Sequence, residues 1–242
     1  MGIFRFKHFS VANEISAMKV NTDGVLLGAA MSIHSEDRRL LDVGTGTGTI
    51  ALMAAQRLMG ENLADVRIDA IDIDGPSATE ASMNFNNSPW TGVLRAYNLP
   101  LDQFARISDE KYDLIFSNPP YFEDSLTAPD ERKSTARHTS EGLSYRDILD
   151  FAKGRLTDSG RVCFVLPADQ ETALCRYGRM CGLHLFRILR VRTVPRKAPS
   201  RIIAEFSHTR VETPCDDMLT IQNEGQYTQE YLSLMKDFYL FA

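Results

Sequence analysis

The string NPPY at 118–121 is the part of this sequence best suited to chemistry. It follows directly after the apolar run YDLIFS, which predicts a buried strand. Two successive prolines end the strand and stiffen the turn, so that the Asn118 side-chain oxygen and the Pro119 carbonyl face one point. Two such acceptors suit the two N–H donors of an exocyclic amine. The ring of Tyr121 offers a flat face on which a base can stack.

A glycine-rich turn lies earlier in the chain, in the string LLDVGTGTGTIAL. Gly44, Gly46 and Gly48 stand between a predicted strand and a predicted helix, where glycine permits a tight turn and a close approach to a ligand. A dinucleotide fingerprint would need glycine or alanine where Thr49 stands, so that pattern fails. The G-x-G-x-G spacing with Asp42 before it resembles the first motif of class I methyltransferases. This resemblance implies S-adenosyl-L-methionine as cofactor, with Asp42 near its ammonium and sulfonium groups.

Two later strand ends supply polar groups for the same cofactor. Asp72 ends the run IDAID, and an acid about 20 residues past such a loop typically accepts hydrogen bonds from ribose hydroxyls. Asp74 is the alternative, although it can simply cap the helix that follows. In the class resembled here, an amide at Asn98 bonds the adenine and an apolar neighbour, Leu99, packs against the ring. Asn98 can equally be an ordinary turn residue.

The NPPY string itself resembles that of methyltransferases that act on adenine N6, guanine N2, cytosine N4 or a glutamine amide. By this resemblance Asn118, Pro119 and Tyr121 are the catalytic residues, and Asn118 also borders the cofactor. A sulfonium is already a good leaving group, so catalysis needs only positioning and directed hydrogen bonds. The motif therefore indicates the type of reaction and leaves the substrate open.

The elements that must position these residues alternate between short apolar runs and stretches of helical spacing. Strands are predicted at 40–43, 66–71, 93–96, 112–116 and 161–166, and helices at 24–33, 49–58, 75–87, 144–156 and 169–181. Such alternation indicates a parallel sheet with helices on both faces. An antiparallel hairpin is expected at 184–195 and 201–208. The fold class is therefore α/β, a Rossmann-like class I methyltransferase with a seven-stranded, mostly parallel sheet and an antiparallel end strand.

The length of 242 residues suits one large domain. We expect a single methyltransferase domain over 1–242. Within it, an extension at 1–38 flanks the cofactor pocket, a core sheet spans 39–209 and an amphipathic helix covers 227–240. The polar region 119–142 lacks periodicity, and a loop of this length inside a compact domain is usually functional or mobile.

The composition excludes several classes of protein. The chain has 27 basic and 32 acidic residues, a formal net charge of −5, and four cysteines with no CxxC pair. No apolar run approaches the ~18 residues that span a bilayer, and the charged start FRFKHF is unlike a signal peptide. We therefore expect a cytoplasmic monomer with no membrane contact, no disulfide scaffold and no metal site.

A more specific resemblance lies in the string AMKVNTDGVLLGA at 17–29, supported by NNSPW at 86–90, ARHT at 136–139 and KDFYL at 236–240. These strings are similar to those of bacterial tRNA (adenine N6)-methyltransferases, which act on adenine 37 of valine tRNA. The likeness spans essentially the whole chain. It implies tRNA as the partner and puts Lys19, Thr22 and Asp23 beside the cofactor pocket. Thr22 or Asp23 can also cap the helix at 24–33. Asn21 departs from the glycine expected there, although asparagine tolerates positive φ.

The distribution of charge also points to RNA. Residues 172–204 contain eight basic side chains and no acidic one. Such a stretch indicates either a phosphate-binding surface or a set of ion pairs with acids elsewhere. The RNA-binding candidates within it are Arg190, Arg192, Arg196, Lys197 and Arg201. By resemblance, Arg137 and His138 in the long loop also contact RNA, although both can equally be solvated.

Three other functions compete with this prediction. A glutamine methyltransferase acting on release factors shares both motifs, but it needs a helical recognition domain, and only 41 residues precede Asp42. A DNA adenine methyltransferase needs a target-recognition domain that is not visible here. A catalytically silent RNA-binding module would be expected to have lost some of Asp42, Asp72 and the NPPY string.

Overall fold

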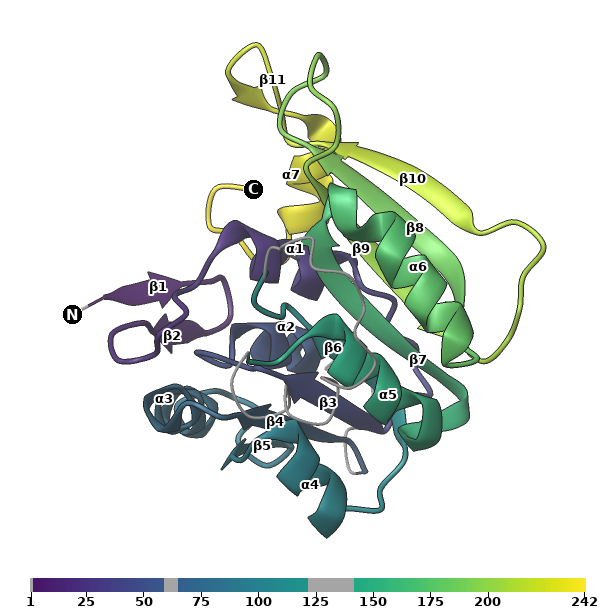
Figure 1. Ribbon diagram of the computed structural model, residues 1–242. Coiled ribbons are helices and arrows are strands. Elements are labelled where there is room, and N and C mark those ends of the chain that lie inside the picture. The colour runs from purple at the N-terminus through teal and green to yellow at the C-terminus, as the bar shows by residue number, and fades with distance from the viewer. Residues whose placement is uncertain (1, 59–64, 122–141) are drawn as a thin grey trace.

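Eight strands form the central sheet of the computed structural model, which describes residues 2–58, 65–121 and 142–242. The order across the sheet is β10-β8-β9-β7-β6-β3-β4-β5. Their bounds are β3 (Arg39–Val43), β4 (Arg67–Asp72), β5 (Leu94–Asn98), β6 (Tyr112–Ser117), β7 (Leu156–Pro167), β8 (His184–Arg192), β9 (Arg201–Ser207) and β10 (Cys215–Thr220). Helices cover both faces of the sheet (Figure 1), which confirms the predicted α/β class.

The parallel strands β3, β4, β5 and β6 bring the predicted site together because they end at the same edge of the sheet. Asp72 and Asn98 are in register at the ends of β4 and β5. β3 leads into the glycine loop, and β6 ends immediately before Asn118. Ligands of open α/β sheets bind at this edge, which we call the carboxyl edge.

The predicted hairpin is confirmed as β8 and β9, in which Val191 lies opposite Arg201. Two details of the sheet were predicted wrongly. The antiparallel strand β9 lies between β7 and β8 rather than at the end, and an eighth strand, β10, pairs with β8 in parallel. β10 escapes prediction because CDDMLT is largely polar and exposed, as is typical of an edge strand. Since Arg201 lies opposite Pro167 at the end of β7, the hairpin turn at 193–200 projects from the carboxyl edge.

The helices divide the core into two apolar clusters, one on each face of the sheet. Their bounds are α1 (Thr22–Ala30), α2 (Thr49–Leu58), α3 (Gly75–Asn86), α4 (Leu101–Ile107), α5 (Tyr145–Arg155), α6 (Glu171–Met180) and α7 (Gln229–Met235), with a 3₁₀ turn at Ala168–Gln170. Side chains of α1, α2 and α7 pack into one cluster, and side chains of α4, α5 and α6 pack into the other. None of the described helices is long and apolar enough to cross a membrane.

The two ends of the chain pack together on the face that α1 covers. β1 (Ile3–Arg5) pairs with β2 (Ser10–Ala12), and β11 (Gln222–Asn223) pairs with β12 (Gln226–Tyr227). Phe6 is buried and stacks on Tyr239, with ring centroids 6.1 Å apart. α7 ends at Met235 and is shorter than the helix predicted at 227–240; beyond it the Phe238 N–H donates to the Met235 carbonyl in the i→i−3 bond of a tighter turn. Its buried residues Tyr231 and Met235 nevertheless face the core as expected.

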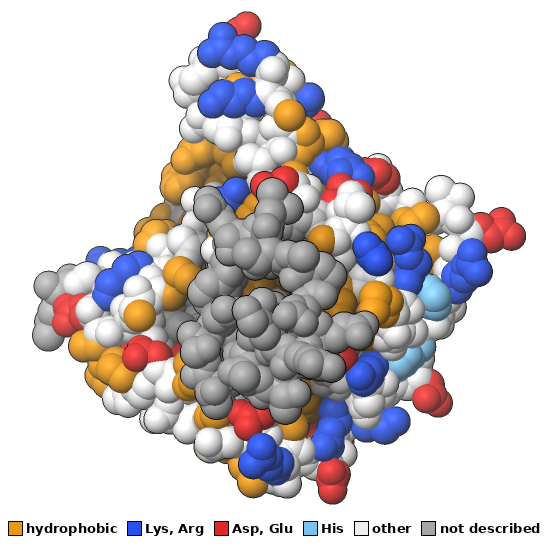
Figure 2. Space-filling model, in the orientation of Figure 1, with side chains coloured by type: hydrophobic (Ala, Val, Ile, Leu, Met, Phe, Trp, Pro, Cys, Tyr) orange, Lys and Arg blue, Asp and Glu red, His pale blue; other side chains and the backbone are white. Residues whose placement is uncertain are grey.

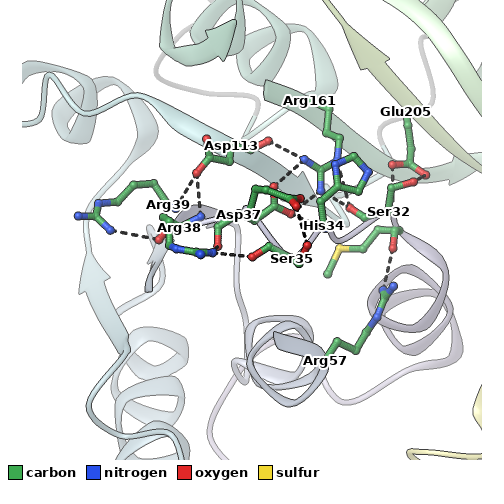
Figure 3. A network of polar contacts seen from close by, with 12 residues as sticks. Ser32, His34, Ser35, Asp37, Arg38, Arg39, Arg57, Asp113, Arg161 and Glu205 are labelled. Carbon is green, nitrogen blue, oxygen red and sulfur yellow. Dashed lines mark hydrogen bonds and ion pairs between the residues drawn. The ribbon is translucent and has the colours of Figure 1, made fainter. Parts of the chain in front are cut away.

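A network of buried charged side chains connects the segment between α1 and β3 to the sheet (Figure 3). Arg161 of β7 is 2% exposed and forms a two-pronged ion pair with Asp37, in which Nη1 lies 2.9 Å from Oδ1. Arg161 also donates to the backbone carbonyls of Ser32 (2.7 Å) and Asp113 (3.1 Å). Glu205 of β9 is fully buried and accepts from the backbone N–H and hydroxyl of Ser32. The segment that joins α1 to β3 is therefore tied to both β7 and β9.

We expect Asp37→Ala to lower the free energy of unfolding by about 3–5 kcal/mol, because it leaves the Arg161 guanidinium buried without its counter-charge. Urea unfolding measures this loss. Replacing both partners, Asp37→Ala with Arg161→Met, should recover a large part of it. A single-variant loss below about 1 kcal/mol, the value of an exposed ion pair, would contradict the assigned role.

Candidate active site

The glycine loop at 44–48 is held in one conformation by its neighbours. Gly44, Gly46 and Gly48 all have positive φ, at 74°, 56° and 80°. A Cβ on Gly48 would lie 2.5 Å from the ring of Phe85 in α3, so a side chain there is excluded by space as well as by backbone conformation. The Gly46 N–H donates to Asp72 Oδ2 at 2.8 Å, which joins the loop to the end of β4.

Asp42 lies beneath this loop with one carboxylate oxygen unsatisfied among the described residues. Its Oδ2 accepts from the Thr45 hydroxyl at 2.7 Å, whereas its buried Oδ1 has no partner there. Burial raises the pKa of Asp42 to about 7, and the nearby charge of Asp72 adds to the rise. A buried acceptor without a donor, next to a turn that needs glycine, fits a ligand that brings its own cationic or N–H groups.

The structure separates the two acids that follow the loop. Both oxygens of Asp72 accept backbone N–H groups, from Gly46 at 2.8 Å and from Asp74 at 2.9 Å. Asp74 is the N-cap of α3 and accepts from the backbone N–H and hydroxyl of Ser77. Asn98 donates its amide to the carbonyls at positions 72 and 73, each at 3.0 Å, which leaves its oxygen as the group for a ligand. Asp74 therefore acts as a helix cap, and the roles of Asp72 and Asn98 toward a cofactor stay predictions.

A pocket opens between the glycine loop, the segment before α1 and Asn118. Lys19 lines it and donates to the carbonyl of Glu14 at 2.6 Å. Asn21 also lines it and is the N-cap of α1, because its Oδ1 accepts from the Gly24 N–H at 2.9 Å. The expectation that Thr22 or Asp23 caps this helix is thus wrong, and Asn21 has an extended φ of −138° rather than a positive one.

The side chain of Asn118 lies at the centre of a polar cluster on the pocket wall. Its Nδ2 is 3.5 Å from Asn21 Oδ1, and its Oδ1 accepts from the Tyr121 hydroxyl at 2.9 Å. The same hydroxyl lies 3.0 Å from Asp23 Oδ2, and Arg201 Nε lies 2.9 Å from that oxygen. The sequence did not indicate the contacts of this cluster with Asn21, Asp23 and Arg201, because their partners are separated by 97 to 178 positions. Pro119 is buried beside Asn118.

Three of the eight basic residues of 172–204 form ion pairs with acids elsewhere in the chain, and two others, Arg176 and Arg179, are exposed on α6. Arg190 pairs with Glu171 and Asp216, Arg201 with Asp23, and Arg187 with Glu205. Hydrogen bonds to both acids raise the pKa of Arg190 above its ordinary value.

The remaining three basic residues of this stretch lie around the hairpin turn. Arg192 donates to the Thr220 hydroxyl at 2.8 Å, whereas Arg196 and Lys197 are exposed. Figure 2 shows Lys and Arg side chains on the projecting top of the molecule, around the β8–β9 turn. Arg137 and His138 lie outside the described residues.

Comparison with known proteins identifies the family. The model of the methyltransferase small domain matches residues 11–173. The chain belongs to this methyltransferase family. It is 42% identical to the tRNA1(Val) (adenine(37)-N6)-methyltransferase of Parabacteroides distasonis, over 98% of this chain and 97% of that one. It is 38% identical to the protein of the same name from Yersinia pseudotuberculosis, over 99% of this chain and 92% of that one.

The fold of this methyltransferase is also found in solved structures. A predicted O-methyltransferase from Agrobacterium tumefaciens superimposes with a TM-score of 0.62 at 15% identity, covering 89% of this chain and 96% of that one. Class I methyltransferases take their methyl group from S-adenosyl-L-methionine, which is the cofactor predicted from the glycine loop. The cofactor supplies a methyl group on a sulfonium. The residues that would hold it are those of the glycine loop and pocket, with Asp42, Asp72 and Asn98.

The NPPY string predicts an exocyclic amine as the group that this methyltransferase binds and orients. In the roles predicted from the sequence, Asn118 Oδ1 and the Pro119 carbonyl would accept its two N–H groups and so direct the nitrogen lone pair at the methyl group. In the described part of the chain, no group of three or more His, Cys, Asp and Glu side chains is placed to hold a metal ion.

Asp72→Ala should weaken the binding of S-adenosylhomocysteine by about 1–3 kcal/mol, because a charged acceptor for the ribose hydroxyls is lost. Titration calorimetry measures this affinity. Asp74→Ala is the matched control and should mainly cost helix stability, about 1 kcal/mol, through loss of the N-cap. If Asp74→Ala loses more affinity for S-adenosylhomocysteine than Asp72→Ala does, Asp74 is the residue that binds the ribose.

Asn118→Ala should lower turnover by ~10²–10³ while leaving the affinity for S-adenosylhomocysteine nearly intact, since one directed hydrogen bond in the site is lost. Turnover is measured with saturating substrate, and cofactor affinity by calorimetry. If the variant keeps more than about a tenth of the wild-type rate, the assignment of Asn118 to the amine is wrong.

Proposed function

We propose that this methyltransferase transfers a methyl group from S-adenosyl-L-methionine to the exocyclic N6 amine of adenine 37 in the anticodon loop of valine tRNA. The observation that carries the proposal is the placement of Asn118, which directly follows β6 and lies on the wall of the same pocket as the glycine loop. An amide acceptor at that point suits an exocyclic amine. The chain is similar over nearly its full length to curated tRNA1(Val) (adenine(37)-N6)-methyltransferases, at 42% and 38% identity. This similarity supports adenine in tRNA as the substrate. We further propose that the protein acts as a monomer in the cytoplasm.

One assay tests the substrate. The protein is incubated with labelled S-adenosylmethionine and tRNA from cells that lack the modification, and the tRNA is then digested to nucleosides. Label in N6-methyladenosine supports the proposal, and sequencing of the labelled tRNA gives its identity and position. Label in release factor and none in tRNA would favour a glutamine methyltransferase instead.

The exposed residues of the hairpin turn should carry the electrostatic part of tRNA binding. Each phosphate neutralised adds roughly 0.7–0.9 to the slope of log affinity against log salt. Replacing Arg196 and Lys197 with alanine should therefore lower tRNA affinity and reduce that slope by up to about two, with no change in cofactor affinity.

The matched control for this variant is Arg176→Ala with Arg179→Ala. These two exposed arginines of α6 lie in the same acid-free stretch, and their removal changes the net charge by the same amount. Binding is measured at several salt concentrations. Equal slopes for the two double variants would show that the turn at 193–200 contributes only general charge.

A further inference from the structure

The Tyr121 hydroxyl has one hydrogen and two acceptors within reach. Asn118 Oδ1 lies at 2.9 Å and Asp23 Oδ2 at 3.0 Å. Burial, and then the charge of Asp23, raise the pKa of Tyr121 far above that of an ordinary tyrosine. The hydroxyl therefore stays protonated and acts as a donor, and it can make a good hydrogen bond to only one of the two acceptors at a time.

This choice matters because Asn118 Oδ1 is the oxygen assigned to the substrate amine. While the phenol donates to that oxygen, an incoming N–H group has to compete with it. A bond from the phenol to the Asp23 carboxylate is charge-assisted and stronger than a bond to a neutral amide. The carboxylate thus offers the hydroxyl a better partner and leaves the amide oxygen open.

We propose that Asp23 is a positioning residue that acts through Tyr121, drawing the tyrosine hydroxyl away from Asn118 so that the substrate amine can be bound. The proposal rests on the function proposed above, since it needs an amine that Asn118 accepts.

Arg201 holds the Asp23 carboxylate in place for this role. Its Nε lies 2.9 Å from the same Oδ2, and its guanidinium lies 5.2 Å from the centroid of the Tyr121 ring. Burial opposes its charge, but the hydrogen bond to Asp23 and the charge of that carboxylate outweigh this, and the pKa of Arg201 is raised. The start of α1, the turn after β6 and the start of β9 are far apart in the chain and thereby meet around one phenol hydroxyl.

Single-turnover rates with saturating tRNA and cofactor test the proposal. Asp23→Ala should lower the rate about five- to tenfold, because the hydroxyl then has only Asn118 to donate to and competes with the amine. Tyr121→Phe keeps the ring but removes the competing donor, so in the double variant Asp23→Ala has no further effect on the rate. This non-additivity is the expected signature of action through Tyr121.

Asp23→Asn keeps a weaker acceptor in place and should lower the rate by less than Asp23→Ala. If Asp23→Ala does not fold, the pair Asp23→Asn and Asp23→Asn with Tyr121→Phe provides the same comparison. The matched control is Asp150→Ala, which removes a carboxylate that accepts from the Tyr177 hydroxyl at 2.7 Å in the helix layer of the other face. That variant should react at the wild-type rate.

Thermal unfolding and calorimetry with S-adenosylhomocysteine accompany each variant. A purely structural role for Asp23 would lower stability or cofactor affinity and would not be reversed by Tyr121→Phe. Additive losses in the double variant, or a wild-type rate for Asp23→Ala, would overturn the proposal. Asn118→Ala in the same assay distinguishes failure of the proposed function from failure of the role of Asp23. If Asn118→Ala still reacts, the proposed amine site is wrong. If Asn118→Ala is inactive and the losses from Asp23→Ala and Tyr121→Phe are additive, only the proposed role of Asp23 is wrong.

Discussion

The buried ion pair between Arg161 and Asp37 is the interaction on which the geometry of the site depends. It fixes the segment that follows α1. Because β7 and β9 hold this segment directly after the last turn of α1, the first turn of the helix has little freedom to move. That first turn carries Asn21 and Asp23 to the side chains that follow β6. Buried charges are costly unless their hydrogen bonds are satisfied, and the additional bonds from Arg161 to two backbone carbonyls meet this condition.

The residues that could be predicted from the sequence are those whose position follows from strand ends. Apolar runs locate the strands, parallel strands end together, and so Gly44, Asp72 and Asn118 had to meet at one edge. Motif spacing added the cofactor and the type of reaction. The methyltransferase family and the α/β class were both confirmed on this basis.

What escaped prediction depends on contacts between distant parts of the chain or on weak local patterns. Asp23 and Arg201 are 178 residues apart, and no periodicity links them. The tolerance of asparagine for positive φ does not explain Asn21, whose backbone is extended and whose side chain caps α1. The acidic β10 carries no apolar alternation, so neither the eighth strand nor its pairing of Asp216 with Arg190 could be foreseen. The basic stretch therefore consists of internal ion pairs, exposed arginines of α6 and an exposed turn, a division that composition alone does not reveal.

The conformation of the glycine loop has a consequence for the energetics of ligand binding. The N–H groups of its three glycines, all with positive φ, are already hydrogen-bonded: that of Gly44 to the Ile71 carbonyl, that of Gly46 to Asp72, and that of Gly48 to the Thr45 carbonyl. The backbone entropy that a flexible loop would lose on contact with a ligand is here lost when the chain folds. Binding to such a preorganised loop carries a smaller entropic penalty, so more of the interaction energy with the cofactor appears as affinity.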